Sequence, residues 1–355
     1  MTRYLFVTFD GGGNLDPELA VATELQVRGH EVRFLGHRAQ EQRIRDAGMV
    51  FSTYITAKPF DGREPHSTAR MLALVSDRTM GRDVLTSLET APADVVVVDG
   101  LLFGVMQSLR AAGRSWVTFA HAFDSYWRKA ARGPLGLALR LRGCPLLSLY
   151  DAGSPTLVMA LPDLDQGAGN VVHAGPTATG QPATPGEKTI LVSFSTFGFA
   201  SLVGLWQRTF DALGGVDARV IATVGPSVPV GRLRIPGSVE VHQWLPHSQV
   251  LPEASLVISH GGHGTAMAAL AHDVPLLILP LDRRSDQPLV GRAISRAGAG
   301  LSLSRHSRPA RIGAAAEQLL ADGPHRAAAA RLGAEIREFD GRRRAADILE
   351  KVSHG

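Results

Sequence analysis

Residues 256–265 read Leu-Val-Ile-Ser-His-Gly-Gly-His-Gly-Thr, and this stretch decides the fold. Its apolar start predicts a buried strand over Leu256–Ile258, and the glycines that follow lead into an alanine-rich segment that predicts a helix beginning near Thr265. Glycines let backbone N–H groups approach a phosphate, and a helix N-terminus adds partial positive charge. We expect an anion-binding turn in which His260 and His263 are further donors and Thr265 supplies an N-cap hydroxyl. The alternative is a tight strand-to-helix turn without a ligand.

The same alternation of short apolar runs and helix-length segments occurs twice along the chain, which is typical of parallel α/β sheets. In the first half it predicts a helix over 18–28 and strands over 4–9, 31–35, 95–98, 116–120 and 156–160, the last closing the first sheet. In the second half it predicts a helix over 202–213 and strands over 189–194, 219–223, 256–258 and 275–279. The predicted fold class is α/β, with two doubly wound Rossmann-like domains that face each other across a cleft containing the active site.

A stretch rich in Pro, Gly and Thr, residues 174–186, separates the two halves and predicts a linker. The expected domains are a first domain over 1–176, a linker over 177–187, a second domain over 188–331, and C-terminal helices over 332–355. Two domains suit a chain of 355 residues, because a single core stops growing near about 250–300 residues.

Composition narrows the classes of function. Cys144 is the only cysteine, which excludes a disulfide framework and a cysteine-based metal site. The net charge is +4 and the arginines are scattered, so nucleic acid is not an expected partner. No apolar targeting segment follows Met1, and we expect a cytoplasmic protein that does not enter the membrane. A homodimer is possible.

Beyond the opening stretch, the second half carries Trp-Leu-Pro-His at 244–247, Val-Pro at 274–275 with Pro280, and Asp-Gln at 286–287. Together with the His-Gly-Gly-His-Gly-Thr turn, this order resembles the nucleotide-sugar signature of the family 1 glycosyltransferases, which have the GT-B fold. Among them the chain most resembles actinobacterial natural-product enzymes that use activated deoxysugars.

The resemblance implies that residues 1–176 form an acceptor-binding domain, that residues 188–331 form a nucleotide-sugar-binding domain, and that the helices over 332–355 pack back on the first domain. It thus implies a donor site in the second half. Trp244 would stack on the nucleobase, His247 would lie near the base edge, and Asp286 and Gln287 would bind sugar hydroxyls. The diphosphate would be held by His260, Gly262, His263, Gly264 and Thr265, and from the other side by Ser193 and Thr196. The usual ribose-binding glutamate of the family is Ala268 here. For Trp244 the alternative is a core aromatic beneath the loop, and for Asp286 it is a helix cap.

The first half contains Phe-Asp-Gly-Gly-Gly-Asn-Leu-Asp-Pro at 9–17, where the family has a histidine three residues before the proline that acts as general base. That position is Asn14, and an amide cannot take a proton at neutral pH. Asp99, which matches the family aspartate that orients the histidine, is one candidate to replace the base. Asp10 and His121 are the others, and each of the three has a structural alternative as a cap or a satisfied cleft residue. A sufficiently acidic acceptor would need little help from a base.

The predicted function is therefore an inverting glycosyltransferase that moves a sugar, expected to be a deoxysugar, from a nucleoside diphosphate to a small natural-product aglycone. We expect a dTDP-sugar rather than a UDP-sugar as co-substrate, and neither a metal nor another cofactor. Acceptor contacts are expected from Gly13 in the first turn and from the aromatic residues Phe123, Tyr126 and Trp127. Two alternatives stay open: a catalytically impaired auxiliary homologue, and a nucleotide-sugar epimerase or hydrolase on the same fold.

Overall fold

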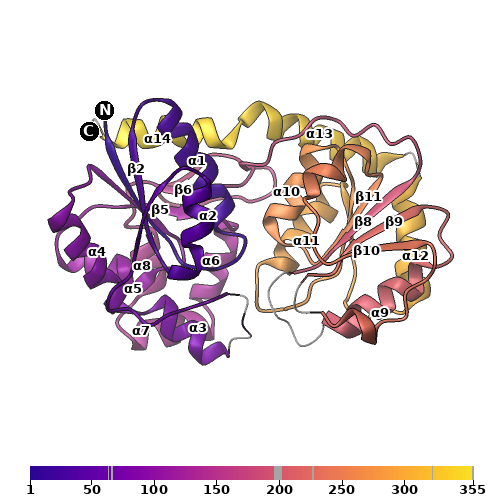
Figure 1. Ribbon diagram of the computed structural model, residues 1–355, viewed down its shortest axis with the longest axis horizontal. Coiled ribbons are helices and arrows are strands. Elements are labelled where there is room, and N and C mark those ends of the chain that lie inside the picture. The colour runs from indigo at the N-terminus through magenta and orange to yellow at the C-terminus, as the bar shows by residue number, and fades with distance from the viewer. Residues whose placement is uncertain (63, 65–66, 196–201, 226–227, 322, 354–355) are drawn as a thin grey trace. The chain divides into compact units, whose positions relative to one another are not determined.

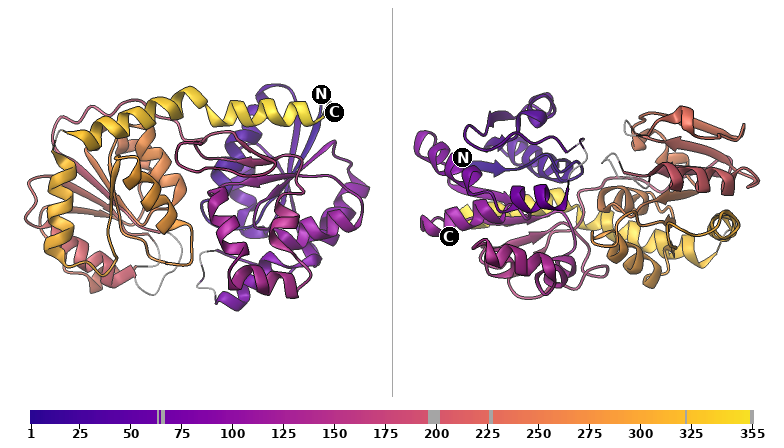
Figure 2. Two further views of the ribbon diagram at one scale, coloured as in Figure 1. Left: turned by 180° about the vertical axis from the view of Figure 1, so that it is seen from behind. Right: turned by 90° about the horizontal axis from the view of Figure 1, so that it is seen from below.

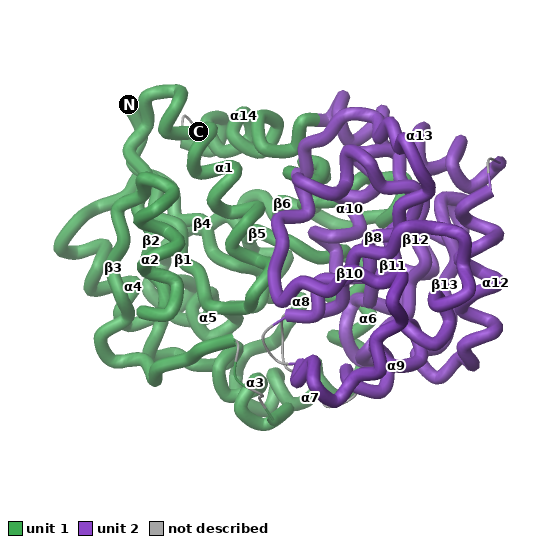
Figure 3. The backbone as a smooth tube through the Cα atoms, turned by 45° about the vertical axis from the view of Figure 1, so that its right-hand side comes forward, with its two compact units in different colours: residues 1–177, 340–355 green, residues 178–339 purple. Residues whose placement is uncertain are grey.

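The computed structural model describes residues 1–62, 64, 67–195, 202–225, 228–321 and 323–353. The chain forms two compact units (Figure 3): unit 1 comprises residues 1–177 and 340–355, and unit 2 comprises residues 178–339. Each unit contains one parallel sheet covered by helices, as Figure 1 shows. The α/β class and the doubly wound character predicted from the sequence are therefore confirmed for each unit.

The sheet of unit 1 has seven parallel strands in the order β3-β2-β1-β4-β5-β6-β7. Its strands are β1 (Arg3–Val7), β2 (Glu31–Gly36), β3 (Val50–Thr53), β4 (Val95–Asp99), β5 (Val117–Ala120), β6 (Thr156–Val158) and β7 (Val171–His173). Strand β4 is the uninterrupted valine run, and all five of its residues are buried because neighbouring strands flank it and helices cover the sheet. The strand order reverses between β1 and β4, which places the loops after these two strands at the topological switch point where open α/β sheets bind ligands.

Helices connect these strands. They are α1 (Leu15–Val27), η1 (Arg38–Gln40), α2 (Glu41–Asp46), α3 (Thr68–Val75), α4 (Arg78–Thr90), α5 (Phe103–Ala111), α6 (Asp124–Ala131), α7 (Pro134–Leu141) and α8 (Leu146–Tyr150). The last helix of the chain, α14 (Gly341–Ser353), returns to this unit and packs on α1. Arg28 beyond α1 donates to Asp347 at 2.6 Å and to Glu350 at 2.8 Å. The left view of Figure 2 shows α14, in yellow, running along unit 1, where the Thr2 hydroxyl lies 3.4 Å from that of Ser353.

Unit 2 repeats the design with six parallel strands in the order β10-β9-β8-β11-β12-β13. The strands are β8 (Thr189–Ser193), β9 (Arg219–Thr223), β10 (Val239–His242), β11 (Leu256–Ser259), β12 (Leu276–Ile278) and β13 (Gly300–Ser302). The helices are α9 (Leu202–Leu213), η2 (Val230–Arg232), η3 (His247–Gln249), η4 (Leu251–Glu253), α10 (His263–Ala271), α11 (Gln287–Arg296), α12 (Pro309–Leu320) and α13 (Pro324–Phe339). The switch point of this sheet lies between β8 and β11.

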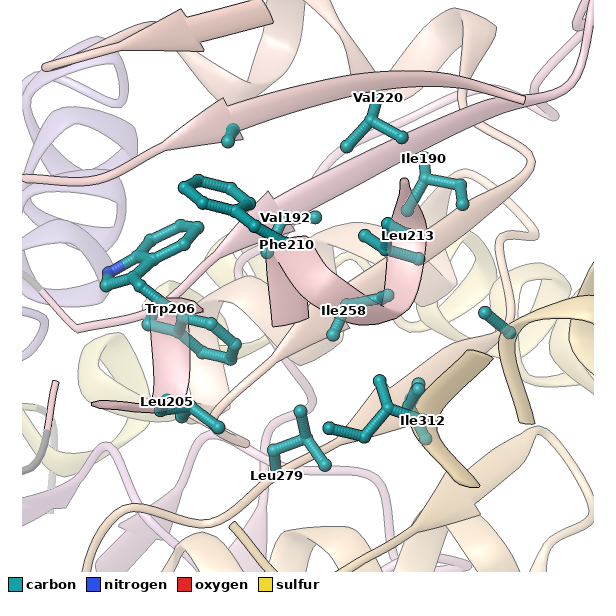
Figure 4. Packing of buried hydrophobic residues seen from close by; sticks show 14 of the residues in the cluster. Ile190, Val192, Leu205, Trp206, Phe210, Leu213, Val220, Ile258, Leu279 and Ile312 are labelled. Atoms are coloured by element: carbon teal, nitrogen blue, oxygen red, sulfur yellow. The ribbon is translucent and has the colours of Figure 1, made fainter. Parts of the chain in front are cut away.

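Each unit has its own hydrophobic core. In unit 2 the buried Trp206 and Phe210 of α9 pack against strand residues such as Val192 and against Ile312 of α12 (Figure 4). In unit 1 the core contains Phe6, Phe34 and Phe119, and α14 adds Ala345, Ala346 and Leu349 to it. The C-terminal helix is therefore part of the first unit's core although the chain has already completed unit 2.

Three details of the sequence prediction differ from the structure. The predicted 177–187 linker is grouped with unit 2 from residue 178 on, where Ala183 N–H donates to the His272 carbonyl at 2.9 Å. The return to unit 1 begins at Asp340 rather than at 332, because α13 packs on α10 up to Phe339. The strand at 156–158 does not close the first sheet, since β7 pairs with it on the outside.

Candidate active site

The turn between β11 and α10 lies at the switch point of unit 2 and joins a strand to a helix, as the sequence predicted for this turn. Helix α10 begins at His263 with Gly262 at the N-cap position, and no side chain caps it. Thr265 is therefore in the first helical turn, and the expected N-cap hydroxyl at Thr265 is wrong: the extended backbone of Gly262 lets the helix start two residues earlier. The amides of this first turn have no acceptors within the helix and can bind an anion.

The three glycines of the turn differ in what surrounds them. Gly261 has a φ of +86°, and a Cβ there would lie 2.8 Å from Ile278 Cγ2 and 3.0 Å from the Gln287 carbonyl oxygen. At Gly262 a Cβ would lie 2.8 Å from the His260 ring, whereas at Gly264 an added Cβ would have no heavy atom of the described residues within 4 Å, apart from its chain neighbours and the backbone of its own helix. Gly261 and Gly262 thus fix the shape of the turn, and in the described part of the chain Gly264 leaves space over the helix start.

His260 stands at the end of β11 with an unsatisfied ring nitrogen. Its Nδ1 is buried and has no hydrogen-bond partner in the part of the chain that the structure describes. Burial lowers the pKa of His260 from 6.5 to about 4, so the imidazole is neutral at pH 7. A buried nitrogen without a partner is unfavourable, and an anion at the helix start can supply one.

The loop after β10 presents the predicted base-binding residues. Trp244 is 70% exposed, which excludes the alternative that it is a core aromatic. His247 in η3 lies with its Nε2 3.0 Å from the hydroxyl of Ser193, at the end of β8, and burial lowers the pKa of His247. The structure thus joins Ser193 to His247, two residues predicted separately. Thr196 lies outside the described residues.

Asp286 and Gln287 start α11. Asp286 occupies the N-cap position, yet its side chain makes no capping hydrogen bond, so the capping alternative is not what the structure shows. Gln287 is buried, and its Oε1 accepts from the Leu281 and Asp282 amides at 2.8 and 3.1 Å. The amide oxygen of Gln287 therefore binds the 281–282 loop, and its NH₂ group takes no part in these two hydrogen bonds.

In unit 1 the loops after β1 and β4 bring Asn14 and Asp99 together. Asn14 is buried, and its Nδ2 lies 2.9 Å from Asp99 Oδ2 and 2.9 Å from the Phe9 carbonyl oxygen. Its Oδ1 accepts from the Gly11 amide at 3.1 Å. Because both the NH₂ group and the oxygen of its side-chain amide form hydrogen bonds, Asn14 links the glycine turn to Asp99.

Asp99 is also the partner of His121, which follows β5. The His121 Nδ1 lies 3.4 Å from Asp99 Oδ2, and the Leu101 amide donates to Asp99 Oδ1 at 2.8 Å. Burial alone would raise the pKa of Asp99, but His121 and these hydrogen bonds hold it below its usual value. Asp99 is fully buried whereas 19% of the His121 side chain is exposed. The geometry therefore fits an ionised Asp99 that orients His121, with the histidine the more accessible of the two.

Glu18, which sequence reasoning missed, lies in the same cluster. It is 1% exposed, and burial first and the neighbouring Asp99 second raise its pKa well above the usual value. Its spacing of four residues from Asn14 puts both on one face of α1. That spacing was the available signal, but it does not by itself show that Glu18 is buried.

The remaining candidate, Asp10, accepts a hydrogen bond from the Gly62 amide at 2.7 Å. A Cβ at Gly62 would lie 2.3 Å from the Asp10 carbonyl oxygen, so the two loops approach closely. The hydrogen bond from the Gly62 amide to the Asp10 carboxylate thus links Gly62 to the first glycine turn.

The predicted acceptor residues divide by burial. Phe123 and Trp127 are buried, and the Trp127 ring lies between those of Phe103 and Tyr150 at centroid distances of 6.0 and 6.2 Å. Their burial does not support the expected direct contact with an acceptor, because their rings are used in the core. Tyr126 is half-buried, and Gly13 is exposed.

The Asp-Leu-Asp segment at 163–165 has a structural role. Asp165 accepts from the Ser125 amide at 3.1 Å and also from the Asp124 amide, and so caps the start of α6. No group of three or more His, Cys, Asp or Glu among the described residues is arranged to hold a metal ion. Within the same residues, no helix combines the length and apolarity needed to cross a membrane.

The chain is similar to proteins of known families. Residues 207–340 match the family described as erythromycin biosynthesis protein CIII-like, C-terminal domain. The chain is 27% identical to 4'-demethylrebeccamycin synthase of Lentzea aerocolonigenes, over 98% of this chain and 99% of that protein. It is 26% identical to demethyllactenocin mycarosyltransferase of Streptomyces fradiae, over 99% of this chain and 86% of the relative.

Solved structures show the same fold. The glycotransferase of kitacinnamycin superposes with a TM-score of 0.81 at 23% identity, over 99% of this chain and 98% of the other. The glycosyltransferase VinC in complex with DTDP superposes with a TM-score of 0.77 at 21% identity, over 99% of this chain and 100% of the other. These matches lend no support to the epimerase, hydrolase or auxiliary alternatives.

Proposed function

We infer, from the premise that this chain has the GT-B fold and is a homologue of the glycosyltransferases of antibiotic pathways, that it moves a sugar from a nucleoside diphosphate to a small natural-product acceptor. The observation that carries this inference is the switch-point turn of unit 2. In the described part of the chain the start of α10 has no side-chain cap and His260 Nδ1 has no hydrogen-bond partner, which offers contacts for a diphosphate. The exposed Trp244 in the loop after β10 offers a contact for the base.

In the proposed donor site, the base stacks on Trp244 and the diphosphate lies over the first turn of α10. The amide N–H groups of that turn and the His260 imidazole offset the negative charge that develops on the departing diphosphate, without a metal ion. The NH₂ group of Gln287 and the carboxylate of Asp286 bind hydroxyls of the sugar. A thymidine nucleotide is favoured because the VinC structure of the same fold contains DTDP.

The proposed acid–base residues are in unit 1. His121 takes the proton of the acceptor hydroxyl at Nε2, while Asp99 at Nδ1 stabilises the imidazolium that forms. The acceptor oxygen forms a bond to the anomeric carbon as the bond from that carbon to the diphosphate breaks, and the electron pair leaves with the diphosphate. Attack from the face opposite the leaving group inverts the configuration of the sugar. Asn14 holds Asp99 in place and takes no proton.

Calorimetric titration tests the donor site. Thymidine diphosphate and uridine diphosphate are titrated into the wild type, His260→Ala and a control, His325→Ala, whose ring lies at the start of α13 and bonds the Gly298 carbonyl oxygen. We expect the wild type and the control to bind thymidine diphosphate more tightly than uridine diphosphate, and His260→Ala to bind both weakly. Failure of the wild type to bind either nucleotide better than His260→Ala would refute the donor site.

A further inference from the structure

Three hydroxyl side chains form a row at the carboxyl ends of neighbouring strands in unit 2. Ser193 ends β8 and is in register with Ser259 of β11 on one side and with Thr223 of β9 on the other. In two of these strands the preceding residue, Val192 or Ile258, belongs to the hydrophobic core of the unit. Side chains alternate along a strand, and residues in register in parallel strands face the same way. The hydroxyl row therefore lies at the switch point of the sheet, on the face opposite that core.

The members of the hydroxyl row differ in their hydrogen bonds. Ser259 Oγ accepts from the Gly261 amide at 3.1 Å and so belongs to the turn before α10. Thr223 is 7% exposed, and its buried Oγ1 has no hydrogen-bond partner in the described part of the chain. Ser193 is 6% exposed, and its Oγ lies 3.0 Å from Nε2 of His247. A buried hydroxyl that lacks a partner is unfavourable, and a ligand rich in oxygen atoms can supply one.

His247 contacts this row from η3 and can do so in two ways. Burial lowers the pKa of His247 below its usual value, so the imidazole is neutral at pH 7 and carries one hydrogen, on Nε2 or on Nδ1. If Nε2 accepts, the Ser193 hydroxyl uses its hydrogen toward His247 and presents only lone pairs to a ligand. If Nε2 donates, the hydroxyl hydrogen is left for another acceptor. The second arrangement suits an anion, because phosphate oxygens are strong acceptors.

We propose that His247 is a positioning residue whose Nε2–H donates to Ser193 Oγ, so that the Ser193 hydroxyl donates in turn to an oxygen of the diphosphate. This inference rests on the proposed donor site. It replaces the expectation that His247 acts at the edge of the base, because the imidazole then acts through Ser193 on the phosphate end of the nucleotide. A hydroxyl that accepts from an N–H group is also a stronger donor, since hydrogen bonds in a chain polarise one another.

Competition against a fluorescent thymidine diphosphate analogue separates the two ends of the nucleotide, with inorganic pyrophosphate and thymidine as the competing probes. His247→Asn removes the donor at the position of Nε2, whereas the longer amide in His247→Gln keeps one there. The matched control is His325→Asn, since the His325 ring bonds the Gly298 carbonyl oxygen at 2.7 Å, at the start of α13. We expect His247→Asn to bind pyrophosphate roughly threefold to tenfold more weakly and thymidine unchanged. His247→Gln and His325→Asn should bind both probes as the wild type does.

A double-mutant cycle with Ser193→Ala gives a readout that a merely structural role of His247 would not move. Ser193→Ala should weaken pyrophosphate binding by roughly tenfold or more, because a hydrogen bond to a charged oxygen is lost. Adding His247→Asn to Ser193→Ala should cause no further loss, since no hydroxyl is left to orient. The proposal is overturned if the two losses add, if His247→Asn weakens thymidine binding, or if it leaves pyrophosphate binding unchanged.

If His247→Asn does not fold, the nitrogen-15 shifts of the His247 ring decide, because they distinguish the two neutral forms of an imidazole. They are recorded in the wild type saturated with thymidine diphosphate and assigned from His247→Gln. A hydrogen on Nε2 supports the proposal, and a hydrogen on Nδ1 alone overturns it. A wild type that binds neither thymidine diphosphate nor pyrophosphate would refute the donor site itself, whereas the other adverse outcomes refute only the role of His247.

Discussion

Binding of thymidine diphosphate should bring a proton onto His260. The pKa of the free residue is about 4 because the ring is buried, so at pH 7 protonation is disfavoured by about three pH units, or about 4 kcal/mol. A negative charge about 4 Å from the ring contributes about 4 kcal/mol at an effective dielectric constant near 20. Since a diphosphate carries more than one negative charge, its contact with His260 offsets the cost of protonation.

The sign of the pH dependence follows from this shift. The bound pKa is higher than the free value of about 4, so the contribution of His260 to affinity is complete at low pH and is lost as pH rises through the bound pKa. Between the two pKa values, affinity should fall by about tenfold for each pH unit. The phosphate itself also titrates, and therefore the ratio of wild-type affinity to that of His260→Asn isolates the histidine.

The assay is calorimetry from pH 5 to 8 in pairs of buffers with different ionisation enthalpies, which counts the protons taken up. The control is His272→Asn, because His272 caps the other end of α10 and burial also lowers its pKa. We expect proton uptake in the wild type and in His272→Asn, and less in His260→Asn. The reasoning is refuted if His260→Asn takes up as many protons as the wild type, or if the affinity ratio is constant across this pH range.

Three substitutions test other parts of the site. Trp244→Ala should leave the melting temperature unchanged because the ring is 70% exposed, yet weaken thymidine diphosphate binding by about 1–3 kcal/mol if the base stacks there; unchanged affinity in calorimetry would remove Trp244 from the donor site. Gly261→Ala should lower the denaturation midpoint, because its φ is +86° and the added Cβ would clash with Ile278. Gly264→Ala should retain the stability of the wild type but bind the nucleotide more weakly. Equal stability of the two variants would contradict the described turn. Asp99→Asn should reduce kcat by roughly a hundredfold to ten-thousandfold while nucleotide affinity, which depends on unit 2, is retained; wild-type turnover in a rapid-quench assay would show that Asp99 does not orient the base.

The parallel sheets were predictable because uninterrupted apolar runs in the sequence indicate their central, buried strands. The 219–223 strand and the 202–213 helix have the predicted bounds, and the valine run is β4. The four edge strands β3, β7, β10 and β13 were missed, since edge positions tolerate polar and glycine residues that give no apolar run. Helix α10 starts earlier than predicted because a glycine, rather than Thr265, serves as its N-cap.

The candidate site was predictable where neighbours in sequence are neighbours in space. The turn over residues 259–265 is of this kind, and the structure places it as expected. The acid–base cluster is not, because its members come from β1, β4 and β5 and meet only when the sheet forms. Asp99 and His121 were treated as alternatives from the sequence, whereas the structure pairs them at 3.4 Å. Glu18 was missed because its spacing of four residues from Asn14 does not by itself show that its side chain is buried.

The central proposal, sugar transfer with His121 as base, is tested most directly by mass spectrometry of one reaction. A panel of dTDP-deoxysugars is incubated with phenolic and polyketide acceptors, using the wild type and His121→Asn. We predict that the wild type forms a glycosylated acceptor and releases an equal amount of thymidine diphosphate, while His121→Asn binds the nucleotide normally and forms little product. Equal product from both proteins would contradict the role of His121, and donors that bind but remain intact with every acceptor would contradict the transfer itself.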